Sequence, residues 1–336
     1  MEQRVLGRTG LRVSMLGYGA GAVGGLMVRG TPAEQERSLG TALDAGVTYV
    51  DTAPAYGNGL SERNLGRVLK ALGAHPVLGT KARLPAGLHQ AGSHQAVARG
   101  EIAGAIAASL EASLARLGRD SVDLFQLHDP IGTTEGYSLA QVLEEAVPAM
   151  QRLRAAGKCR FLGITALGEV AALRALFEAG VIDTAQVPFN ALNPSWLSPL
   201  PASLPGQDFE RLGETAVARG VGLIGIRILA AGALSGVAAR HPLAMPEVAP
   251  IASGADYAAD VANARRLLPL VEAGAAGSLA ELAIRFAITP VRTGPGQIGT
   301  ALIGTASQEQ LEVALAAVAK GPLPDAVLAR VAALMA

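Results

Sequence analysis

The sequence predicts an α/β fold, a closed (β/α)8 TIM barrel with an N-terminal β-hairpin and an extra C-terminal helix. Eight short runs rich in β-branched residues or leucine alternate with longer segments of helical period, at about 40 residues per unit. Such a rhythm indicates parallel strands buried on both faces, and a closed barrel and a doubly wound open sheet both satisfy it. We favour the barrel because a short hairpin precedes the first strand, where it can close the barrel floor.

The expected elements follow one another in a regular order. The hairpin is expected from Arg4–Leu6 and Leu11–Val13, within residues 1–14. The eight barrel strands are expected at Met15–Gly19, Thr48–Asp51, Val77–Lys81, Val122–His128, Arg160–Thr165, Thr184–Pro188, Gly222–Ile226 and Thr300–Ile303. Serines mark the starts and glycines the ends of three helices, at Ser61 and Gly73, Ser138 and Gly157, and Ser307 and Gly321. A glutamine three residues after Ser138 and after Ser307 matches a capping box.

No low-complexity linker divides the chain, so we expect one barrel domain over residues 1–336. Residues 237–277, which are rich in alanine, proline and glycine, are expected to form a long excursion before the last strand. Residues 321–336 are expected to form a helix in the C-terminal tail.

Composition and charge exclude several classes of function. The 28 basic and 28 acidic side chains give zero net charge, which argues against the clustered positive charge that nucleic-acid binding needs. The single cysteine, Cys159, cannot form an internal disulfide or a thiolate metal site, so a reducing cytoplasm is the expected location. We expect Cys159 to be an unreactive barrel residue. The N-terminus has charges and glycines where a signal peptide has an apolar stretch.

The apolar segment Val221–Ala239 is long enough to resemble a membrane span. Arg227 lies within it, and a charge at the centre of a bilayer costs about 2.5 kcal/mol or more. We therefore expect a buried strand followed by a glycine-rich loop, and no association with a membrane. No pattern in the sequence fixes the oligomeric state.

Two glycine patterns have the spacing G-x-G-x-x-G, at Gly19–Gly24 and at Gly294–Gly299. In a dinucleotide fold of the Rossmann type, this turn opens directly into a helix whose N-terminus binds the pyrophosphate. After Gly24 no helix is expected before Pro32, and the second pattern precedes a strand instead of following one. Both patterns are therefore interpreted as loop glycines.

Four titratable side chains of different types lie at or near the ends of successive strands, namely Asp51, Tyr56, Lys81 and His128. In a parallel barrel the C-terminal ends of the strands surround one mouth, so these side chains are expected to meet there. Each alone has an ordinary structural explanation, such as a turn cap for Asp51 or a hydrogen-bonded core histidine for His128. Their joint match to successive strand ends favours a site.

A site of this composition suits proton transfer at a carbonyl oxygen. A tyrosine hydroxyl, with an ordinary pKa of about 10, is a poor acid or base at neutral pH, and a neighbouring ammonium favours the phenolate. A buried aspartate keeps the lysine charged and oriented, while a histidine can donate a hydrogen bond to the carbonyl oxygen. The set holds no nucleophile for acyl transfer. The remaining histidines lack the spacing of metal ligands, so no metal is expected; they are His75, His89, His94 and His241.

At these residues the chain resembles the aldo-keto reductase superfamily of NAD(P)(H)-dependent oxidoreductases, over nearly its whole length from about Arg4. The segments that carry the resemblance are Leu6–Val13, Asp51–Glu62, Thr80–Lys81, Val122–His128, Gly157–Thr165 and Gln186–Asn190. The stretch from His128 to Leu153 looks most similar to the branch that includes L-galactose and related aldose dehydrogenases. The resemblance implies Tyr56 as the general acid/base, with Lys81 and Asp51 tuning it. It implies His128 as the group that positions the substrate carbonyl.

The resemblance also implies NAD or NADP as the cofactor, bound along the barrel mouth. The implied binding residues are Gly19, Ala20, Asp51, Thr165, Gln186, Ile226, Arg227, Leu229, Gly304, Thr305 and Gln310. Gln186 and Thr165 correspond to residues that bind the nicotinamide carboxamide, but Ala166 replaces the usual asparagine, so one hydrogen bond is expected to be lost. Ile226 stands where many members have an aromatic ring. Arg227 is either a phosphate contact or an ion-paired barrel residue.

Ala306 bears on the choice between the two cofactors. Many members have an arginine at this position, which binds the 2′-phosphate of NADP through strong charge-assisted hydrogen bonds. Its absence predicts that NAD is used at least as well as NADP. The backbone N–H groups of the last barrel helix still suit phosphate oxygens.

The substrate is expected to be a small carbonyl compound or the corresponding alcohol. The resemblance favours a sugar or lactol, while the framing loops, rich in Ala, Leu, Pro and Gly, suit an apolar aldehyde or ketone equally well. Two other functions stay open. One is a non-catalytic nicotinamide-binding subunit, of the kind found among channel-associated β subunits. The other is a barrel lyase that uses Lys81 to form a Schiff base.

Overall fold

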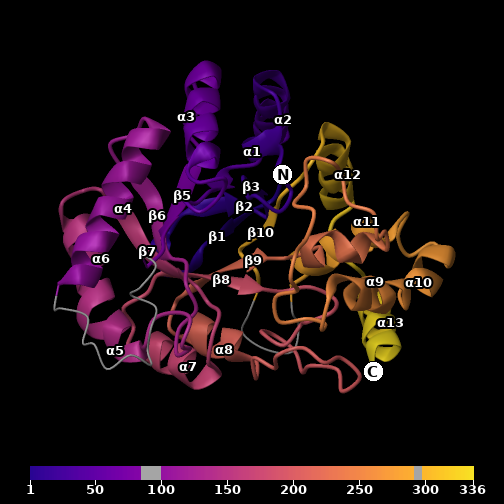
Figure 1. The fold of residues 1–336 in the computed structure, drawn as a ribbon. Helices are drawn as coiled ribbons and strands as arrows, with labels where there is room; N and C mark the ends of the chain where they lie inside the picture. The colour runs from indigo at the N-terminus through magenta and orange to yellow at the C-terminus, as the bar shows by residue number, and fades with distance from the viewer. Residues whose placement is uncertain (85–99, 291–296) are drawn as a thin grey trace.

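In the computed structural model, which describes residues 1–84, 100–290 and 297–336, eight parallel strands close into a barrel (Figure 1). The strands are β3 Leu16–Gly19, β4 Tyr49–Asp51, β5 Val77–Ala82, β6 Val122–Leu127, β7 Cys159–Thr165, β8 Thr184–Pro188, β9 Gly222–Ile226 and β10 Thr300–Ile303. Each differs from its expected range by at most one residue at either end, so the predicted closed barrel is confirmed. His89, His94, Gly294 and Gly296 lie outside the described residues.

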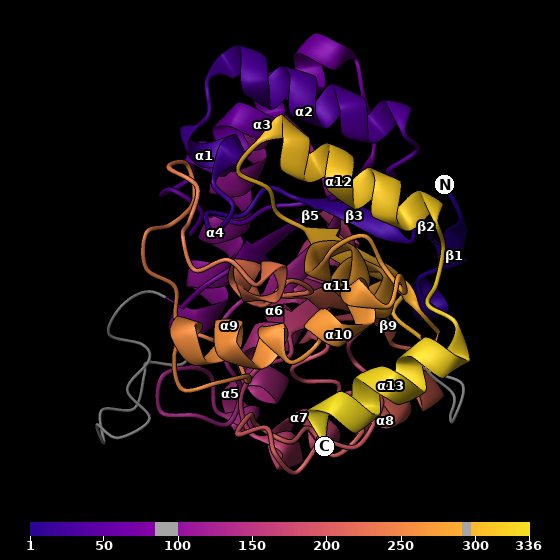
Figure 2. The same cartoon turned by 90° about the vertical axis from the view of Figure 1, so that its right-hand side faces the viewer.

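The barrel closes between its last strand and its first. β10 pairs with β3, with Ala301 opposite Leu16, and on its other side β10 pairs with β9, with Thr300 opposite Ile224. In the outer layer, α12 (Gln308–Ala319) lies beside α2 (Pro32–Asp44), as the yellow and indigo helices of Figure 2 show. The first and last units of the chain therefore meet in the strand layer and in the helix layer.

The N-terminal hairpin covers the lower end of the barrel, as expected. β1 (Gln3–Val5) and β2 (Arg12–Ser14) pair antiparallel, with η1 (Gly7–Thr9) between them. Leu6 is fully buried against side chains from inside the barrel. The residues of this contact, which we call the floor cluster, are Leu6, Leu11, Val13, Tyr49, Leu124, Ile224 and Leu302. The N–H of Arg8 donates to the carbonyl of Gly220 at 2.6 Å and ties η1 to the start of β9.

Helices surround the barrel and extend it beyond the eight units. Besides α2 and α12 they are α1 Leu26–Arg29, α3 Leu60–Leu72, α4 Glu101–Leu117, α5 Leu139–Gln141, η2 Val142–Ala146, α6 Val147–Ala155, α7 Val170–Glu178, α8 Leu212–Ala218, η3 Ala230–Ser235, α9 Tyr257–Arg265, α10 Leu268–Glu272, α11 Leu279–Ile288 and α13 Asp325–Met335. The excursion at 237–277 contains α9 and α10, and α13 is the predicted C-terminal helix, which lies beside α10 (Figure 2).

The apolar segment Val221–Ala239 contains β9 and η3. Among the helices in the described parts of the chain, none has the length and hydropathy that a membrane crossing requires.

Serine caps two of the three helices for which it was predicted. Ser138 and Gln141 form both hydrogen bonds of a capping box, and Ser307 accepts from the N–H of Gln310. The helical stretch after Ser138 is interrupted by the π-helical turn η2, which ends just before Pro148. Proline has no N–H and its ring clashes with the carbonyl one turn earlier, so the turn before Pro148 cannot keep the regular α-helical hydrogen bonds.

The predicted start of a helix at Ser61 is wrong. α3 begins at Leu60, after Gly59 in the left-handed conformation with φ of 80°, and no side chain caps it. The Ser61 hydroxyl is buried and donates to the carbonyl of Ala20 at 2.7 Å, and it lies 2.7 Å from the hydroxyl of Thr52. This serine therefore ties α3 to the ends of β3 and β4 instead of satisfying the N–H groups of the helix.

The expectation that no helix precedes Pro32 is also wrong, because α1 forms one short turn directly after Gly25. The residue before Gly25, Gly24, must be a glycine because its loop packs closely on the loop after β10. An added Cβ at Gly24 would lie 2.6 Å from the carbonyl oxygen of Thr305. The N–H of Leu26 donates to the same carbonyl at 3.2 Å. Gly24 thus lets the β3–α1 loop pack on the loop after β10, and it belongs to a barrel, not to a Rossmann sheet.

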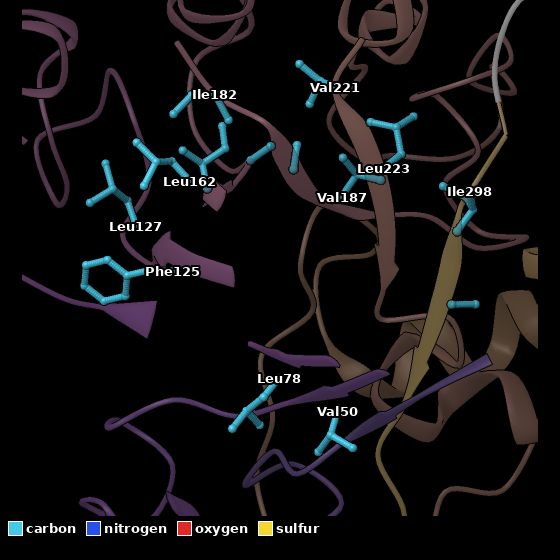
Figure 3. Close-up of a cluster of buried hydrophobic side chains, with 14 of the residues drawn as sticks. Val50, Leu78, Phe125, Leu127, Leu162, Ile182, Val187, Val221, Leu223 and Ile298 are labelled. Atoms are coloured by element: carbon cyan, nitrogen blue, oxygen red, sulfur yellow. The ribbon is translucent and has the colours of Figure 1, made fainter. Parts of the chain in front are cut away.

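The main core lies between the barrel and the helices around it. Val50, Leu78 and Phe125 extend from their strands into this layer, as the sticks of Figure 3 show. Because side chains alternate along a strand, the residues that follow them, Asp51, Gly79 and Gln126, face the barrel interior. The alternation therefore delivers polar groups to the inside of the barrel.

Candidate active site

The structure brings the four predicted titratable side chains together at one end of the barrel. Asp51 is the last residue of β4, Lys81 lies near the end of β5, and His128 directly follows β6. Tyr56 lies in the turn between β4 and α3. Asp51 and Lys81 are buried, with exposed fractions of 3 % and 0 %.

Lys81 connects Asp51 to Tyr56. Its ammonium forms an ion pair with Oδ2 of Asp51 and donates to the hydroxyl of Tyr56 at 3.2 Å and to the carbonyl of Thr52 at 2.9 Å. Burial alone lowers the pKa of Lys81, but the charge of Asp51 and the contact with Tyr56 outweigh burial, so this pKa lies above its ordinary value. The side chain is therefore an ammonium at neutral pH, and each of its three protons has an acceptor.

His128 contacts Tyr56 from the other side. The two rings meet edge to face, with centroids 5.6 Å apart and an interplanar angle of 86°. Burial, together with the positive charges of Lys81 and Arg83, lowers the pKa of His128 well below its ordinary value. The imidazole is therefore neutral at physiological pH and has one N–H donor. Its Nδ1 is buried and has no partner within the described residues.

Asp51 also accepts hydrogen bonds from residues that the sequence analysis missed. Tyr49 donates its hydroxyl to Oδ1 at 3.0 Å, and Gln126 donates its amide to the same oxygen at 3.2 Å. A signal in the sequence could have found both. Tyr49 precedes Asp51 by two residues and Gln126 precedes His128 by two, and a spacing of two places side chains on the same face of a strand.

A buried carboxylate outside the barrel is hydrogen-bonded to β5, the strand that carries Lys81. Glu62 of α3 is fully buried, accepts from the hydroxyl of Thr80 at 2.7 Å and forms an ion pair with Arg116 of α4 at 2.6 Å. Thr80 directly precedes Lys81, so its side chain points to the opposite face of β5. The contact therefore links α3, α4 and β5 on the side away from the ion pair.

The predicted cofactor residues lie at the same end of the barrel. Gly19 ends β3 and Ala20 follows it, and the N–H of Ala20 donates to the carbonyl of Asp51 at 2.8 Å. Gly304 and Thr305 follow β10, and a Cβ at Gly304 would lie 3.4 Å from the carbonyl oxygen of Gly19. These loops are therefore neighbours.

Thr165 and Gln186 lie opposite each other in the register of β7 and β8. The amide nitrogen of Gln186 donates to Oδ1 of Asp51 at 2.6 Å, so this nitrogen is already engaged inside the barrel. The hydroxyl of Thr165 is buried and has no partner in the described parts of the chain. A ligand amide at this position would meet a free hydroxyl and one oxygen of the Gln186 side chain.

Arg227 follows β9 and has a left-handed backbone with φ of 54°. Its guanidinium donates to the carbonyl of Ala249 at 3.3 Å and forms no ion pair with a carboxylate of the described residues. Burial and the charge of Arg240 lower the pKa of Arg227, whereas Tyr56 and Asp260 act in the opposite sense. Ile226 and Leu229, on either side of it in the chain, are half-buried.

The loop before α12 is held by its own side chains. Ala306 is buried, and its N–H donates to Oε1 of Gln310 at 2.8 Å. The side chain of Gln310 therefore orders the loop instead of closing a capping box with Ser307. No guanidinium stands at position 306, as the sequence shows.

These residues fit a nicotinamide dinucleotide. Buried hydroxyls normally have a hydrogen-bond partner, yet Thr165 and Thr305 have none within the described residues. Thr165 ends β7 and Thr305 follows β10, and Arg227 and the N-terminus of α12 lie along the same end of the barrel. Such a series of donors suits an elongated ligand with an amide at one end and phosphates at the other.

Cys159 lies at the start of β7, at the opposite end of that strand from Thr165. It is buried, and burial raises the pKa of its thiol to about 11. The thiol therefore stays protonated, in agreement with the expectation of an unreactive barrel residue.

Comparisons with known proteins agree with this geometry. A solved structure of an aldo-keto reductase from Bacillus halodurans, in its holo form, superimposes with a TM-score of 0.71 at 22% sequence identity, over 100% of this chain and 97% of that one. L-galactose dehydrogenase of Arabidopsis thaliana is 36% identical over 173 residues, which are 50% of this chain and 49% of that protein. D-threo-aldose 1-dehydrogenase of a Pseudomonas species is 38% identical over 185 residues, 51% of this chain and 55% of that protein.

The matched region spans about half the length of these curated relatives. The sequence profile of the Aldo/keto reductase family, in contrast, matches residues 15–336, which include all eight barrel strands and the four titratable residues. The chain therefore belongs to the aldo/keto reductase family.

Proposed function

We propose that this protein is an NAD(P)-dependent oxidoreductase that interconverts a carbonyl compound and the corresponding alcohol, with Tyr56 as the general acid/base. The observation that carries the proposal is the contact of the Lys81 ammonium with the Tyr56 hydroxyl at 3.2 Å, backed by the ion pair with Asp51. An ammonium beside a phenol stabilises negative charge on its oxygen, so the hydroxyl can give up a proton and take one back.

The remaining roles follow from charge and position. His128 is neutral and lies against Tyr56, so it can donate a hydrogen bond to the same carbonyl oxygen that receives the proton. Lys81 and Asp51 keep their charges because each compensates the other inside the barrel. In the reduction direction Tyr56 donates a proton to the carbonyl oxygen, and in the oxidation direction its phenolate removes one from the alcohol.

When bound, the nicotinamide supplies or accepts the hydride at the carbonyl carbon. Thr165 and the oxygen of Gln186 would hold its carboxamide, and Ile226 and Leu229 would pack beside the ring. Arg227, Gly304 and Thr305 would hold the phosphates, together with the backbone at the start of α12. Gln310 would act through the loop that it orders.

We propose further that NAD is used at least as well as NADP. Ala306 offers no positive charge to a 2′-phosphate, and Glu309 adds a carboxylate in the first turn of α12. The ratio of kcat/KM with NADH and NADPH tests this proposal. A hundredfold preference for NADPH would overturn it, whereas Ala306→Arg should shift the ratio towards NADPH by about tenfold or more.

The substrate class has two candidates. The similarity to L-galactose dehydrogenase and D-threo-aldose 1-dehydrogenase favours a sugar or its lactol, which the enzyme would oxidise. The apolar composition of the framing loops suits an aldehyde or ketone with few hydroxyl groups. We propose the sugar as the first candidate because it has support from two relatives.

A substrate screen tests the proposed function. Aldoses, lactols, aldehydes and ketones are offered in both directions with both cofactors, and the absorbance of the reduced nicotinamide is followed. Turnover that Tyr56→Phe abolishes supports the proposal. Cofactor binding with no turnover of any compound would favour the non-catalytic alternative.

The geometry argues against a Schiff-base lyase. A nucleophilic amine must be neutral, whereas the ion pair with Asp51 keeps Lys81 protonated. Borohydride in the presence of a carbonyl substrate should therefore trap no adduct at Lys81, and a trapped adduct would contradict the assignment.

A further inference from the structure

The buried carboxylate of Asp51 has more donors than an ion pair with Lys81 requires. Three neutral groups converge on Oδ1, namely the hydroxyl of Tyr49 at 3.0 Å, the amide of Gln126 at 3.2 Å and the amide of Gln186 at 2.6 Å. Lys81 occupies Oδ2. The two oxygens of one carboxylate therefore have separate tasks.

We propose that Tyr49 and Gln126 are positioning residues for the reaction, which hold Oδ1 of Asp51 so that Oδ2 stays directed at Lys81. This inference rests on the proposed function, because its consequence is the state of the Tyr56 hydroxyl. Neither residue contacts Tyr56, so both act through Asp51 and Lys81.

Glycines make room for the two donors inside the barrel. A Cβ at Gly79 would lie 2.6 Å from the Tyr49 hydroxyl oxygen and 3.2 Å from Oδ1 of Asp51. A Cβ at Gly163 would lie 2.8 Å from Cγ of Gln126. The interior of such barrels is usually filled by branched apolar side chains. Here β5 and β7 have glycines at these interior positions, and the side chains of Tyr49 and Gln126 occupy the space.

The donors on Oδ1 do not change with pH. Burial and the neighbouring charge of Asp51 raise the pKa of Tyr49 well above its ordinary value, so its hydroxyl stays protonated. Gln126 on β6 and Gln186 on β8 do not titrate. Within the described residues, the ionisable side chains that contact Asp51 are Tyr49 from β4 and Lys81 from β5. Lys81 in turn contacts Tyr56, against which the His128 ring lies edge to face, and Arg227 interacts electrostatically with Tyr56.

Removal of one donor changes how the carboxylate shares its charge. With the Tyr49 hydroxyl absent, Asp51 attracts the Lys81 protons more strongly, because a carboxylate that loses a hydrogen bond becomes a better acceptor elsewhere. The ammonium then stabilises negative charge on Tyr56 less well. The effect on the reaction is therefore electrostatic, and it leaves the substrate contacts in place.

The test compares Tyr49→Phe with Tyr18→Phe. Tyr18 is as deeply buried on the adjacent strand, but its hydroxyl lies 3.1 Å from Ser38 in the helix layer and does not contact Asp51. With 4-nitrobenzaldehyde and NADH or NADPH as the probe, Tyr49→Phe should lower kcat about threefold to tenfold and leave KM nearly unchanged. The pH at which kcat falls should rise by about one unit. Tyr18→Phe should leave kcat, KM and the pH profile unchanged.

A second readout does not depend on turnover. In a pH titration followed by tyrosinate absorbance, the step that is lost in Tyr56→Phe reports the ionisation of Tyr56. This step should occur at higher pH in Tyr49→Phe and at an unchanged pH in Tyr18→Phe. Gln126→Met should move it in the same direction, and it decides the question if Tyr49→Phe does not fold. An unmoved step in the folded variants, or an equal shift with Tyr18→Phe, would overturn the inference. Absence of turnover by the wild type would instead count against the proposed function.

Discussion

The two ends of the barrel interior have opposite chemistry, although the same strands build both. At the floor, Leu6, Leu124 and Ile224 are apolar and fully buried. At the other end, Asp51 and Lys81 are buried to almost the same degree but carry full charges. Apolar burial stabilises a fold, whereas the desolvation of a buried ion pair offsets most of its attraction. The comparison associates stability with the floor and the proposed chemistry with the charged end, and Tyr49 alone of the floor cluster extends a hydroxyl to Asp51.

The largest loss of stability is expected when one partner of the buried ion pair is removed and the other is kept. Lys81→Met leaves Asp51 charged and unpaired, and we expect the free energy of unfolding in urea to fall by about 3–5 kcal/mol, with activity lost. The double variant Asp51→Asn, Lys81→Met should recover most of that stability and none of the activity. A double variant as unstable as the single one would show that the ion pair itself holds the fold together.

At the floor, Leu124→Ala should cost stability and spare the reaction. A cavity at this fully buried position is expected to lower the free energy of unfolding by about 3 kcal/mol, while kcat of the folded fraction stays within about twofold. Leu60→Ala, at a position 44% exposed, is the matched control and should have little effect. A large loss of kcat in Leu124→Ala would mean that the two ends of the barrel are coupled.

Tyr56→Phe should do the reverse of Leu124→Ala, because it should reduce kcat and leave stability unchanged. It removes the proposed proton donor and keeps the ring, so kcat should fall by about a hundredfold or more, while the melting temperature and the Kd of NADH stay nearly unchanged. Equilibrium fluorescence titration with NADH measures the binding. An unchanged kcat would remove Tyr56 from its proposed role.

The smallest effect concerns His128 and pH. Its pKa lies well below the ordinary value in the folded protein, so on acidification the unfolded chain binds a proton before the native protein does. Stability should therefore fall as the pH drops below about 6.5, and His128→Asn should lose about 1 kcal/mol less than the wild type between pH 7.5 and 5.5. Urea unfolding at the two pH values measures the difference. Equal losses would show that another group governs the acid sensitivity.

Much of this division was predictable from the sequence. Short strands in a regular rhythm predicted a parallel sheet, and the hairpin before them favoured a closed barrel over an open sheet. The position of Asp51, Lys81 and His128 at strand ends predicted that they meet. Local patterns failed where long-range contacts decide. Ser61 has the pattern of a helix cap, but its hydroxyl is used by Ala20 and Thr52, which only the packed barrel brings to it.

The hydrogen bond from Gln186 to Asp51 could likewise not be predicted from the sequence. It joins β8 to β4 across the interior, and no spacing along the chain specifies which of several inward-facing amides reaches a given carboxylate. The short helix α1 escaped prediction because it depends on Gly25 and on the loop after β10, which the chain supplies much later.

The Glu62 contact has a consequence for protein engineering. Glu62 lies in the helix layer and accepts a hydrogen bond from Thr80, which directly precedes Lys81. A substitution at Glu62 or at its partner Arg116 can therefore shift the backbone next to Lys81 from outside the barrel. Libraries confined to residues around the reaction centre would miss such sites. Substitutions between α3 and α4, where Glu62 is fully buried, would act on the backbone beside Lys81 without altering Lys81, Tyr56 or His128 themselves.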